Sequence, residues 1–370
     1  MATIAFYPLG NADSSLTEFE DGRLMLIDYC DCKDPKEKKD RRIDLPEELR
    51  AELARRDRED FDVVAFTHAD DDHVAGAENF FWLEHAEKYQ GEDRIRIKEL
   101  WVPANSILEE GTEDSARAIR QEARYRVKKN KGVRVFGNRG CLDEWLKGEG
   151  IKPETRKHLI THAGQPVPGF TRDDGQAELF VHSPFGFRME GEEVDRNNAS
   201  LVLHAAFFAS GNPYRVMFGG DAEWEAWRDI DYISQKKGNS DRLKWDGFKI
   251  AHHCSYAALG PEKGDEETEP VPEVAHLFDQ GQPACILVSS SDPIPSKDTD
   301  QPPHKQAAAY YKRVATKKKG EFVVTMETPS KDHPEPIVIE VTDRGLLRRK
   351  RSATPSAAAV VVARPAPRVG

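Results

Sequence analysis

The sequence predicts an α/β protein in which two mixed β-sheets carry helices on their outer faces. Short apolar runs that are typical of strands alternate with helix-like segments over most of the 370 residues. No repeat of fixed spacing and no clear linker precedes residue 345. We therefore expect one domain over residues 1–345, a length that is sufficient to bury a sizeable core.

The first part of the chain alternates between strand-like and helix-like runs. One helix-like run opens on Thr112-Glu113-Asp114, a typical N-terminal signal, and Pro46 lies near the start of another. From about residue 131 to residue 175 the pattern is irregular. We expect strands over residues 3–9, 23–28, 61–67 and 99–103, and helices over residues 45–57, 74–90 and 112–131.

The second part of the chain is richer in strands. The basic run at residues 348–351 leads into an Ala/Pro/Val segment with several prolines and no amphipathic period. We expect residues 346–370 to form a disordered basic tail. Before it, we expect a helix over residues 304–317 and strands over 178–182, 200–207, 214–218, 248–251, 285–289, 321–326 and 336–341.

Composition indicates a globular protein with a heavily charged surface, because 38% of the residues are apolar and 32% are charged. The net charge of −11 does not favour nonspecific contact with polyanions, so nucleic-acid binding would need a basic patch or metal ions. No segment approaches the length of a membrane-spanning helix, and the chain opens on a strand-like run. Five cysteines fit a reducing compartment. We expect a cytoplasmic protein that does not associate with membranes.

The most informative segment is residues 67–73, which read Thr-His-Ala-Asp-Asp-Asp-His directly after an apolar run. Carboxylates and imidazoles this close repel one another or compete for protons unless a cation neutralises them. The alternative, an acidic turn that caps the next helix, explains the pattern less well. The segment therefore predicts a metal site with His68, Asp70, Asp72 and His73 as ligands.

Three later segments also place ligand-type side chains at the ends of strands or the start of a helix. Gly219 and Gly220 allow a tight turn that directs Asp221 inward, His252 and His253 follow an apolar run, and a last histidine is His304. Each of these segments alone is more often structural than catalytic. Their occurrence together, after residues 67–73, favours a shared site.

In this order the motifs resemble those of the metallo-β-lactamase fold superfamily, and within it the ComEC/Rec2-like metallohydrolase domain of DNA-uptake proteins and its soluble relatives. That branch carries Asp in place of the second His of His-x-His-x-Asp-His, as residues 67–73 do. Further similarities lie at Gly10–Ser14, at the strand that ends in Asp28, and at residues 197–203, 219–221, 251–255 and 303–304. The similarity spans roughly residues 3–315.

The chain also departs from the branch. Ala12 and Cys254 stand where glycine is usual, and the third-motif histidine is not evident. Arg196 and Asn197 lie in its place, and His182 is the nearest alternative.

The resemblance implies a four-layer αβ/βα sandwich with an insertion at about residues 92–175 and a binuclear metal centre. It also assigns roles to single residues. We expect His252 to be a ligand, because it comes directly off its strand, and His253 to contact substrate. The expected metal ligands are His68, Asp70, Asp72, His73, Asp221 and His252, the supporting residues are Asp13, Asp28 and Asn197, and the catalytic residues are Asp72, His253 and His304.

These residues predict a metal-dependent hydrolase with two divalent ions, Zn²⁺ or Mn²⁺, with Mg²⁺ as a further candidate. Asp70 in place of His makes the site harder and more anionic, which favours phosphodiester chemistry by a metal-activated hydroxide, as in a nuclease. The basic segment 124–134 is a candidate nucleic-acid contact, although a solvated helix end is the stronger interpretation. Two alternatives stay open: a hydrolase of small esters, lactones or thioesters, and a non-catalytic metal-binding regulatory module with a protein partner.

Overall fold

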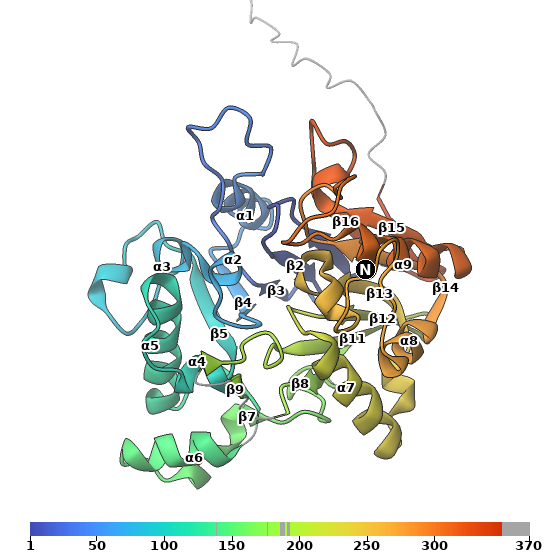
Figure 1. Cartoon of the computed structure of the whole chain (residues 1–370). Coiled ribbons are helices and arrows are strands. Elements are labelled where there is room, and N and C mark those ends of the chain that lie inside the picture. The colour runs from blue at the N-terminus through green and yellow to red at the C-terminus, as the bar shows by residue number, and fades with distance from the viewer. Residues whose placement is uncertain (138, 176, 186–188, 191–192, 350–370) are drawn as a thin grey trace, which may run out of the picture.

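Two β-sheets packed face to face form the centre of the molecule (Figure 1). The computed structural model describes residues 1–137, 139–175, 177–185, 189–190 and 193–349. The first sheet is antiparallel up to β3 and parallel from β3 to β7. In spatial order it contains β17 (Gly345–Arg348), β16 (Ile337–Thr342), β1 (Thr3–Phe6), β2 (Ser15–Glu18), β3 (Leu24–Ile27), β4 (Asp60–Ala65), β5 (Arg96–Pro103), β6 (Val133–Phe136) and β7 (Ile160–Thr161).

The second sheet is also mixed. Its strands run parallel from β15 to β12, and the last two pairs are antiparallel. The order is β15 (Glu321–Val324), β14 (Gly281–Ser289), β13 (Trp245–Ile250), β12 (Asn212–Phe218), β11 (Val202–Ala209) and β8 (Ala177–Ser183). A short ribbon of β9 (Met189–Glu190) and β10 (Glu193–Val194) stands apart from both sheets.

Helices cover the outer face of each sheet, so that the molecule has the predicted four layers. One apolar core lies between the sheets, a second joins the first sheet to α1, α3, α5 and α6, and a third joins the second sheet to α7, α8 and α9. In Figure 1, α3 and α5 lie to the left of the sheets, and α7 and α8 lie at the lower right. The helices are α1 (Leu45–Ala54), α2 (Asp71–Val74), α3 (Ala77–Phe80), α4 (Ala104–Leu108), α5 (Asp114–Lys129), α6 (Arg139–Gly148), α7 (Trp224–Lys236), α8 (Pro272–Asp279) and α9 (Lys305–Lys317).

The predicted helix over residues 74–90 is wrong. The chain forms the short α2 and α3, separated by Gly76 at φ +77°, and a single 3₁₀ turn at Glu87–Tyr89. A side chain at Gly76 would meet Cβ of Asp31 at 2.9 Å, so this turn needs glycine. After α3 the chain extends, and Phe81 forms a bridge to Ile95.

Residues 92–175, the predicted insertion, supply β5, β6 and β7 and three helices of the same layer. They therefore complete the first sheet, and their status as an insertion stays a prediction.

At the other end of the chain, β17 continues past the predicted domain boundary at residue 345, because Leu346 is buried in the core between the sheets. Residues 350–370 of the predicted tail lie outside the described residues.

The topology brings the predicted site residues to one edge of the sandwich. The segments that follow β3, β4, β12 and β13 carry Asp28, residues 67–73, Asp221 and the two adjacent histidines, and Asp13 lies in the turn between β1 and β2. Carboxyl ends of parallel strands are where such sheets usually gather functional side chains.

Over the part of the chain that the structure describes, every helix is too short or too polar to cross a bilayer.

Candidate metal centre

Asp28 fixes the loop that carries most of the predicted ligands. Its carboxylate accepts hydrogen bonds from the backbone N–H and the hydroxyl of Thr67, each at 2.7 Å. The same carboxylate lies 2.8 Å from Nδ1 of His73. A carboxylate at one ring nitrogen orients the imidazole and directs the other nitrogen, Nε2, towards a ligand. Asp28 therefore lies where it can orient the ring of His73, and its support of a metal ligand stays a prediction.

The turn after β12 depends on its glycines. Gly220 adopts φ +53°, and a side chain there would meet Cβ of Ser200 at 3.0 Å and Cβ of Thr67 at 3.1 Å. The turn therefore packs directly against the loop at residues 67–73. This close approach places the buried carboxylate of Asp221 opposite His73, with 3.3 Å between Oδ1 and Nε2.

Four buried side chains converge at this point: Asp13, His73, Asp221 and His253. One ligand-type atom from each lies within 4.8 Å of the others. Nε2 of His73 is 3.7 Å from Oδ2 of Asp13, and Nε2 of His253 is 3.4 Å from Oδ2 of Asp221. The structure thus brings Asp13, expected only as a supporting residue, among the potential ligands.

A second group, of His68, Asp72 and His73, adjoins the first and shares His73 with it. Asp72 links the two groups, because its Oδ2 lies 2.8 Å from Nε2 of His253. Its side chain is 35% exposed, whereas His68 and His73 are buried. Residues 67–73 therefore face a centre with a closed inner part and a more open outer part.

The two adjacent histidines have different surroundings. Nδ1 of His253 lies 2.8 Å from the carbonyl oxygen of Ser290, so this nitrogen donates and Nε2 faces the centre. His252 belongs to neither described group, and its Nδ1 lies 3.3 Å from Oε1 of Glu223. Asn197 donates to the same Glu223 oxygen at 3.3 Å. Asn197 thus touches the surroundings of His252 and not those of His253.

Backbone conformation explains why His253, one residue further from the strand, reaches the centre. His252, His253 and Cys254 all adopt left-handed φ values, of 50°, 47° and 65°. Side chains other than glycine rarely occupy this region, and each such residue costs about 1–3 kcal/mol. The resemblance places glycine at position 254, where a positive φ is easily adopted. Three consecutive left-handed residues rotate the chain so that His253 points inward.

Lys249 is a participant that the sequence analysis missed. This buried lysine of β13 donates to the carboxylate of Asp13 and, at 3.2 Å, to the carbonyl oxygen of Gly220. Burial lowers the pKa of Lys249, but the neighbouring carboxylates of Asp13 and Asp221 raise it by more than burial lowers it. The net shift is therefore upward. A single lysine inside the apolar run of β13 was the available signal.

Asp70 and Arg196 lie side by side at the mouth of the centre. Nε2 of His68 is 3.4 Å from Oδ2 of Asp70, and the other Asp70 oxygen accepts a hydrogen bond from Arg196. Arg196 also pairs with Glu109, which follows α4. By the resemblance given above, Arg196 stands where a third-motif histidine is expected, and in the structure it bridges Asp70 and Glu109.

The remaining predicted residues lie outside both groups. Nδ1 of His304 accepts from the backbone N–H of Tyr256 at 3.3 Å, and its Nε2 is 3.4 Å from the carbonyl oxygen of Asp300. His182, the alternative third-motif ligand, donates to the carbonyl oxygen of Arg242 at 3.1 Å in the interior of the second sheet. His182 is therefore engaged elsewhere.

The centre is electrostatically prepared for a cation. Burial disfavours a charged His73, yet the carboxylates of Asp221, Asp28 and Asp72 raise its pKa well above the usual value. For His253, the same opposition between burial and Asp221 ends with a pKa of about 10. Burial raises the pKa of Asp221, but His253 and His73 lower it well below the ordinary range. These carboxylates draw positive charge into a buried space.

The donor set fits a divalent metal. Several buried ligand-type atoms have no hydrogen-bond partner among the residues that the structure describes, namely Nε2 of His68 and His73 and Oδ1 of Asp13 and Asp221. Buried polar atoms are normally satisfied, so such a concentration at one point indicates a missing ligand. Two imidazoles and two carboxylates form a mixed set that suits Zn²⁺, Mn²⁺ or Fe²⁺.

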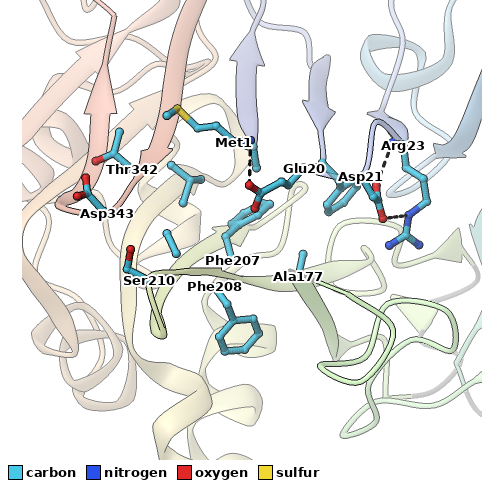
Figure 2. A pocket seen from close by; sticks show the side chains of 14 residues that line it. Met1, Glu20, Asp21, Arg23, Ala177, Phe207, Phe208, Ser210, Thr342 and Asp343 are labelled. Carbon is cyan, nitrogen blue, oxygen red and sulfur yellow. Dashed lines mark hydrogen bonds and ion pairs between the residues drawn. The ribbon is translucent and has the colours of Figure 1, made fainter.

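A separate pocket of about 360 Å³ lies at the opposite end of the sandwich (Figure 2). It lies at the β2–β3, β11–β12 and β16–β17 turns, near Asp21, Ser210 and Asp343. Figure 2 shows the ion pairs of Met1 with Glu20 and of Arg23 with Asp21 at its edge. None of the predicted site residues lines it.

Comparison with known proteins adds only distant similarities. No family model and no curated protein matches the chain. Among solved structures, unliganded yeast PDE1 is 10% identical with a TM-score of 0.42 and covers 88% of this chain and 98% of its own. A diphosphatase from the PhnP family is 10% identical, with a TM-score of 0.33 and coverage of 79% and 87%. The metallo-β-lactamase GOB-18 from Elizabethkingia meningoseptica is 16% identical, with a TM-score of 0.32 and coverage of 75% and 87%.

Identities and TM-scores this low say nothing about activity, which has to be inferred from the side chains of this chain. The ComEC-like part of the resemblance stays a prediction.

Proposed function

We propose that this protein is a metal-dependent hydrolase that cleaves phosphodiester bonds. The observation that carries the proposal is the buried convergence of Asp13, His73, Asp221 and His253, with ligand atoms that lack partners among the described residues. Nε2 of His73 and Oδ1 of Asp221 lie within ion-pair distance of each other, at 3.3 Å, yet neither atom forms a hydrogen bond among the described residues. A cluster that leaves them pointing at one another is the arrangement that a metal ion completes.

We assign the inner position to Asp13, His73, Asp221 and His253. This exchanges the roles of the two adjacent histidines, since Nε2 of His253 faces the centre whereas His252 lies beside Glu223. His252, whose side chain is 21% exposed, then becomes the residue that contacts substrate. The outer position comprises His68, Asp70 and Asp72. We expect Zn²⁺ or Mn²⁺ to bind, with Mg²⁺ as the weaker candidate, because both positions mix imidazoles with carboxylates.

A bound divalent ion at such a centre lowers the pKa of water and polarises a phosphoryl oxygen. The protein supplies the positioning. Asp72 reaches the opening, and the pKa of its carboxyl falls to about 2 because His73 and His253 outweigh the effect of burial. It therefore stays ionised and accepts a hydrogen bond from the attacking water. The catalytic role expected for His304 has no support from its contacts, because Nδ1 accepts from Tyr256 and the proton on Nε2 faces the carbonyl oxygen of Asp300.

The phosphodiester assignment follows from charge. Asp13, Asp72 and Asp221 supply more negative charge than a site of three histidines would, and hard, carboxylate-rich sites favour metal ions that bind phosphate oxygens. A specific preference for nucleic acid has less support, because the basic segment 124–134 is largely neutralised. Arg124 pairs with Glu110, Arg126 with Glu122, Lys128 with Glu149 and Arg134 with Glu99.

Hydrolysis of a substrate panel with Mn²⁺, Zn²⁺ or Mg²⁺ tests the proposal. The panel contains a chromogenic phosphodiester, single- and double-stranded DNA and RNA, and small esters, lactones and thioesters. We expect turnover of phosphodiesters that disappears with chelator and in Asp72→Asn. Turnover of esters alone would replace the proposal with the small-ester alternative. Less than one equivalent of bound metal, with no turnover, would favour a regulatory module.

A cytoplasmic location and a protein partner stay predictions.

A further inference from the structure

We propose that Arg196 binds an anionic oxygen of the substrate phosphoryl group and restrains Asp70 until substrate and metal are present. The inference rests on the proposed function and deepens it, because it names the residue that distinguishes a phosphodiester from a neutral ester. The guanidinium of Arg196 donates to Asp70 beside His68, so it lies at the mouth of the centre, and a guanidinium does not itself bind a metal ion.

Glu109 holds the guanidinium in one orientation. Nε of Arg196 is 3.1 Å from both carboxylate oxygens of Glu109, and NH2 is 2.5 Å from Oε1. The Glu109 side chain is 12% exposed, which makes it a firm anchor. A planar fork fixed along one edge presents its remaining N–H groups in a defined direction, which is the geometry that recognises phosphate.

The edge of the guanidinium that does not contact Glu109 faces the mouth of the centre. NH1 of Arg196 donates to Asp70, whose other oxygen is 3.4 Å from Nε2 of His68. The side chains of Arg196 and Asp70 are 32% and 33% exposed, so both are accessible from outside. Asp70 therefore masks the donor that a phosphoryl oxygen would use, and a cation that attracts Asp70 towards His68 releases that donor.

The backbone around Arg196 is tied to both ligand loops. Its carbonyl oxygen accepts from the hydroxyl of Ser200, and that hydroxyl accepts from the backbone N–H of Asp221 at 3.3 Å. The N–H of Leu201 donates to the carbonyl oxygen of Thr67 at 2.8 Å. Arg196 is thus positioned by the same loops that position the metal ligands. It also joins the segment 92–175, through Glu109, to the centre.

Three variants test this assignment with two binding probes that need no turnover. Inorganic phosphate and Mn²⁺ are each titrated by calorimetry into the full-length protein, and KM is measured for the chromogenic phosphodiester. Arg196→Gln removes the charge, and Arg196→Lys keeps the charge but loses the fork. Arg58→Gln is the matched control, because Arg58 also bridges two carboxylates, Asp60 and Asp62, but at the far end of β4.

We expect Arg196→Gln to weaken phosphate binding and raise KM by about 10- to 100-fold, the range for a charge-assisted hydrogen bond. Mn²⁺ binding should be equal or tighter, because Asp70 is released. Arg196→Lys should recover part of the loss, and Arg58→Gln should match the wild type. Unchanged phosphate affinity in Arg196→Gln would overturn the proposal, and so would loss of bound Mn²⁺, which would show that Arg196 only supports the ligand loop.

The two proposals fail differently. If the wild type binds phosphate through Arg196 but turns over no phosphodiester, the hydrolase assignment is wrong and the anion site stands. If turnover is seen and Arg196→Gln changes neither KM nor phosphate affinity, the anion site is wrong and the hydrolase stands. Thermal unfolding of each variant identifies any loss that is due to misfolding, and Arg196→Lys keeps the test valid if Arg196→Gln does not fold.

Discussion

Two pairs of buried histidines lie in the same sandwich and have opposite electrostatics. His73 and His253 face the carboxylates of Asp221 and Asp72, and their pKa values are raised. His182 and His204 lie in the second sheet with their rings 5.7 Å apart, and each donates to a backbone carbonyl. Burial lowers the pKa of His182 to about 4 and that of His204 to about 3.

The difference shows that burial alone does not make a histidine functional. Both pairs are nearly inaccessible to solvent, at 2% exposure or less. The two pairs differ in their neighbours. Nearby carboxylates favour the charged form of His73 and His253, whereas His182 and His204 lack such neighbours among the described residues and stay neutral. A cation is thus expected at the first pair and excluded from the second. Each prediction below changes one side of this contrast.

Replacing Asp221 with Asn should have the largest effect. The carboxylate faces both His73 and His253, and the amide keeps the shape while removing the charge. Because metal catalysis supplies several kcal/mol, we expect kcat/KM to fall by about 10³-fold or more. Enzyme assays with metal analysis measure this. Asp231→Asn removes a buried carboxylate of α7 that pairs with His276 of α8, and it should leave kcat/KM near the wild-type value. Equal losses in both variants would point to general destabilisation.

The adjacent histidines provide the next test. His253→Asn removes a nitrogen that faces the centre, so Mn²⁺ affinity should fall by more than about 100-fold, beyond the usual cost of losing an outer partner. His252→Asn should keep the metal and mainly raise KM, since His252 lies beside Glu223. Calorimetric titration of both variants measures the affinities. The reverse pattern would restore the sequence-based assignment of His252 as the ligand.

Asp28→Asn should have a smaller effect on metal binding. The carboxylate of Asp28 contacts the far nitrogen of His73 and the Thr67 groups, so the inner ligands stay in place while the ring loses its orienting carboxylate. Loss of such outer partners typically costs about 10- to 100-fold in metal affinity. The Mn²⁺ dissociation constant measures it. An affinity equal to that of the wild type would show that His73 is held by packing alone.

Most of the fold was predictable because strand ends and chemistry coincide in this sequence. The apolar runs before Asp28, His68 and Asp221 became β3, β4 and β12, and the two mixed sheets with outer helices are confirmed. The helix predicted over residues 74–90 failed because hydrophobic periodicity does not show that Gly76 turns left-handed.

The less predictable parts of the site depend on contacts between distant segments. Nothing in the sequence shows that three consecutive non-glycine residues, 252–254, adopt positive φ, so the sequence does not show which of the two histidines faces the centre. The ion pairs of Lys249 with Asp13 and of Arg196 with Glu109 join residues far apart in the chain. The order of the motifs in the sequence predicted that these segments would meet at one site. It did not predict which side chains pair with each potential ligand.

The smallest expected effect is a change in the stability of the protein, and it comes from His182 and His204. Because His182 and His204 are neutral when folded, their contribution to stability is present above the unfolded pKa of about 6.5 and is lost as the pH falls towards their depressed folded values. Between pH 7 and pH 5 the unfolded chain takes up protons that the folded protein does not. Each residue should therefore remove about 2 kcal/mol from the free energy of unfolding.

Urea unfolding of the wild type and of His204→Gln at pH 7 and pH 5 isolates one of these contributions. The difference between the two proteins cancels every other titrating group, the metal centre included, provided that both carry the same metal content. The wild type should lose about 2 kcal/mol more than His204→Gln on acidification. An equal loss in both proteins would mean that His204 is protonated in the folded state. The two buried pairs would then differ less than their carboxylate neighbours indicate, and burial would no longer account for the neutral pair.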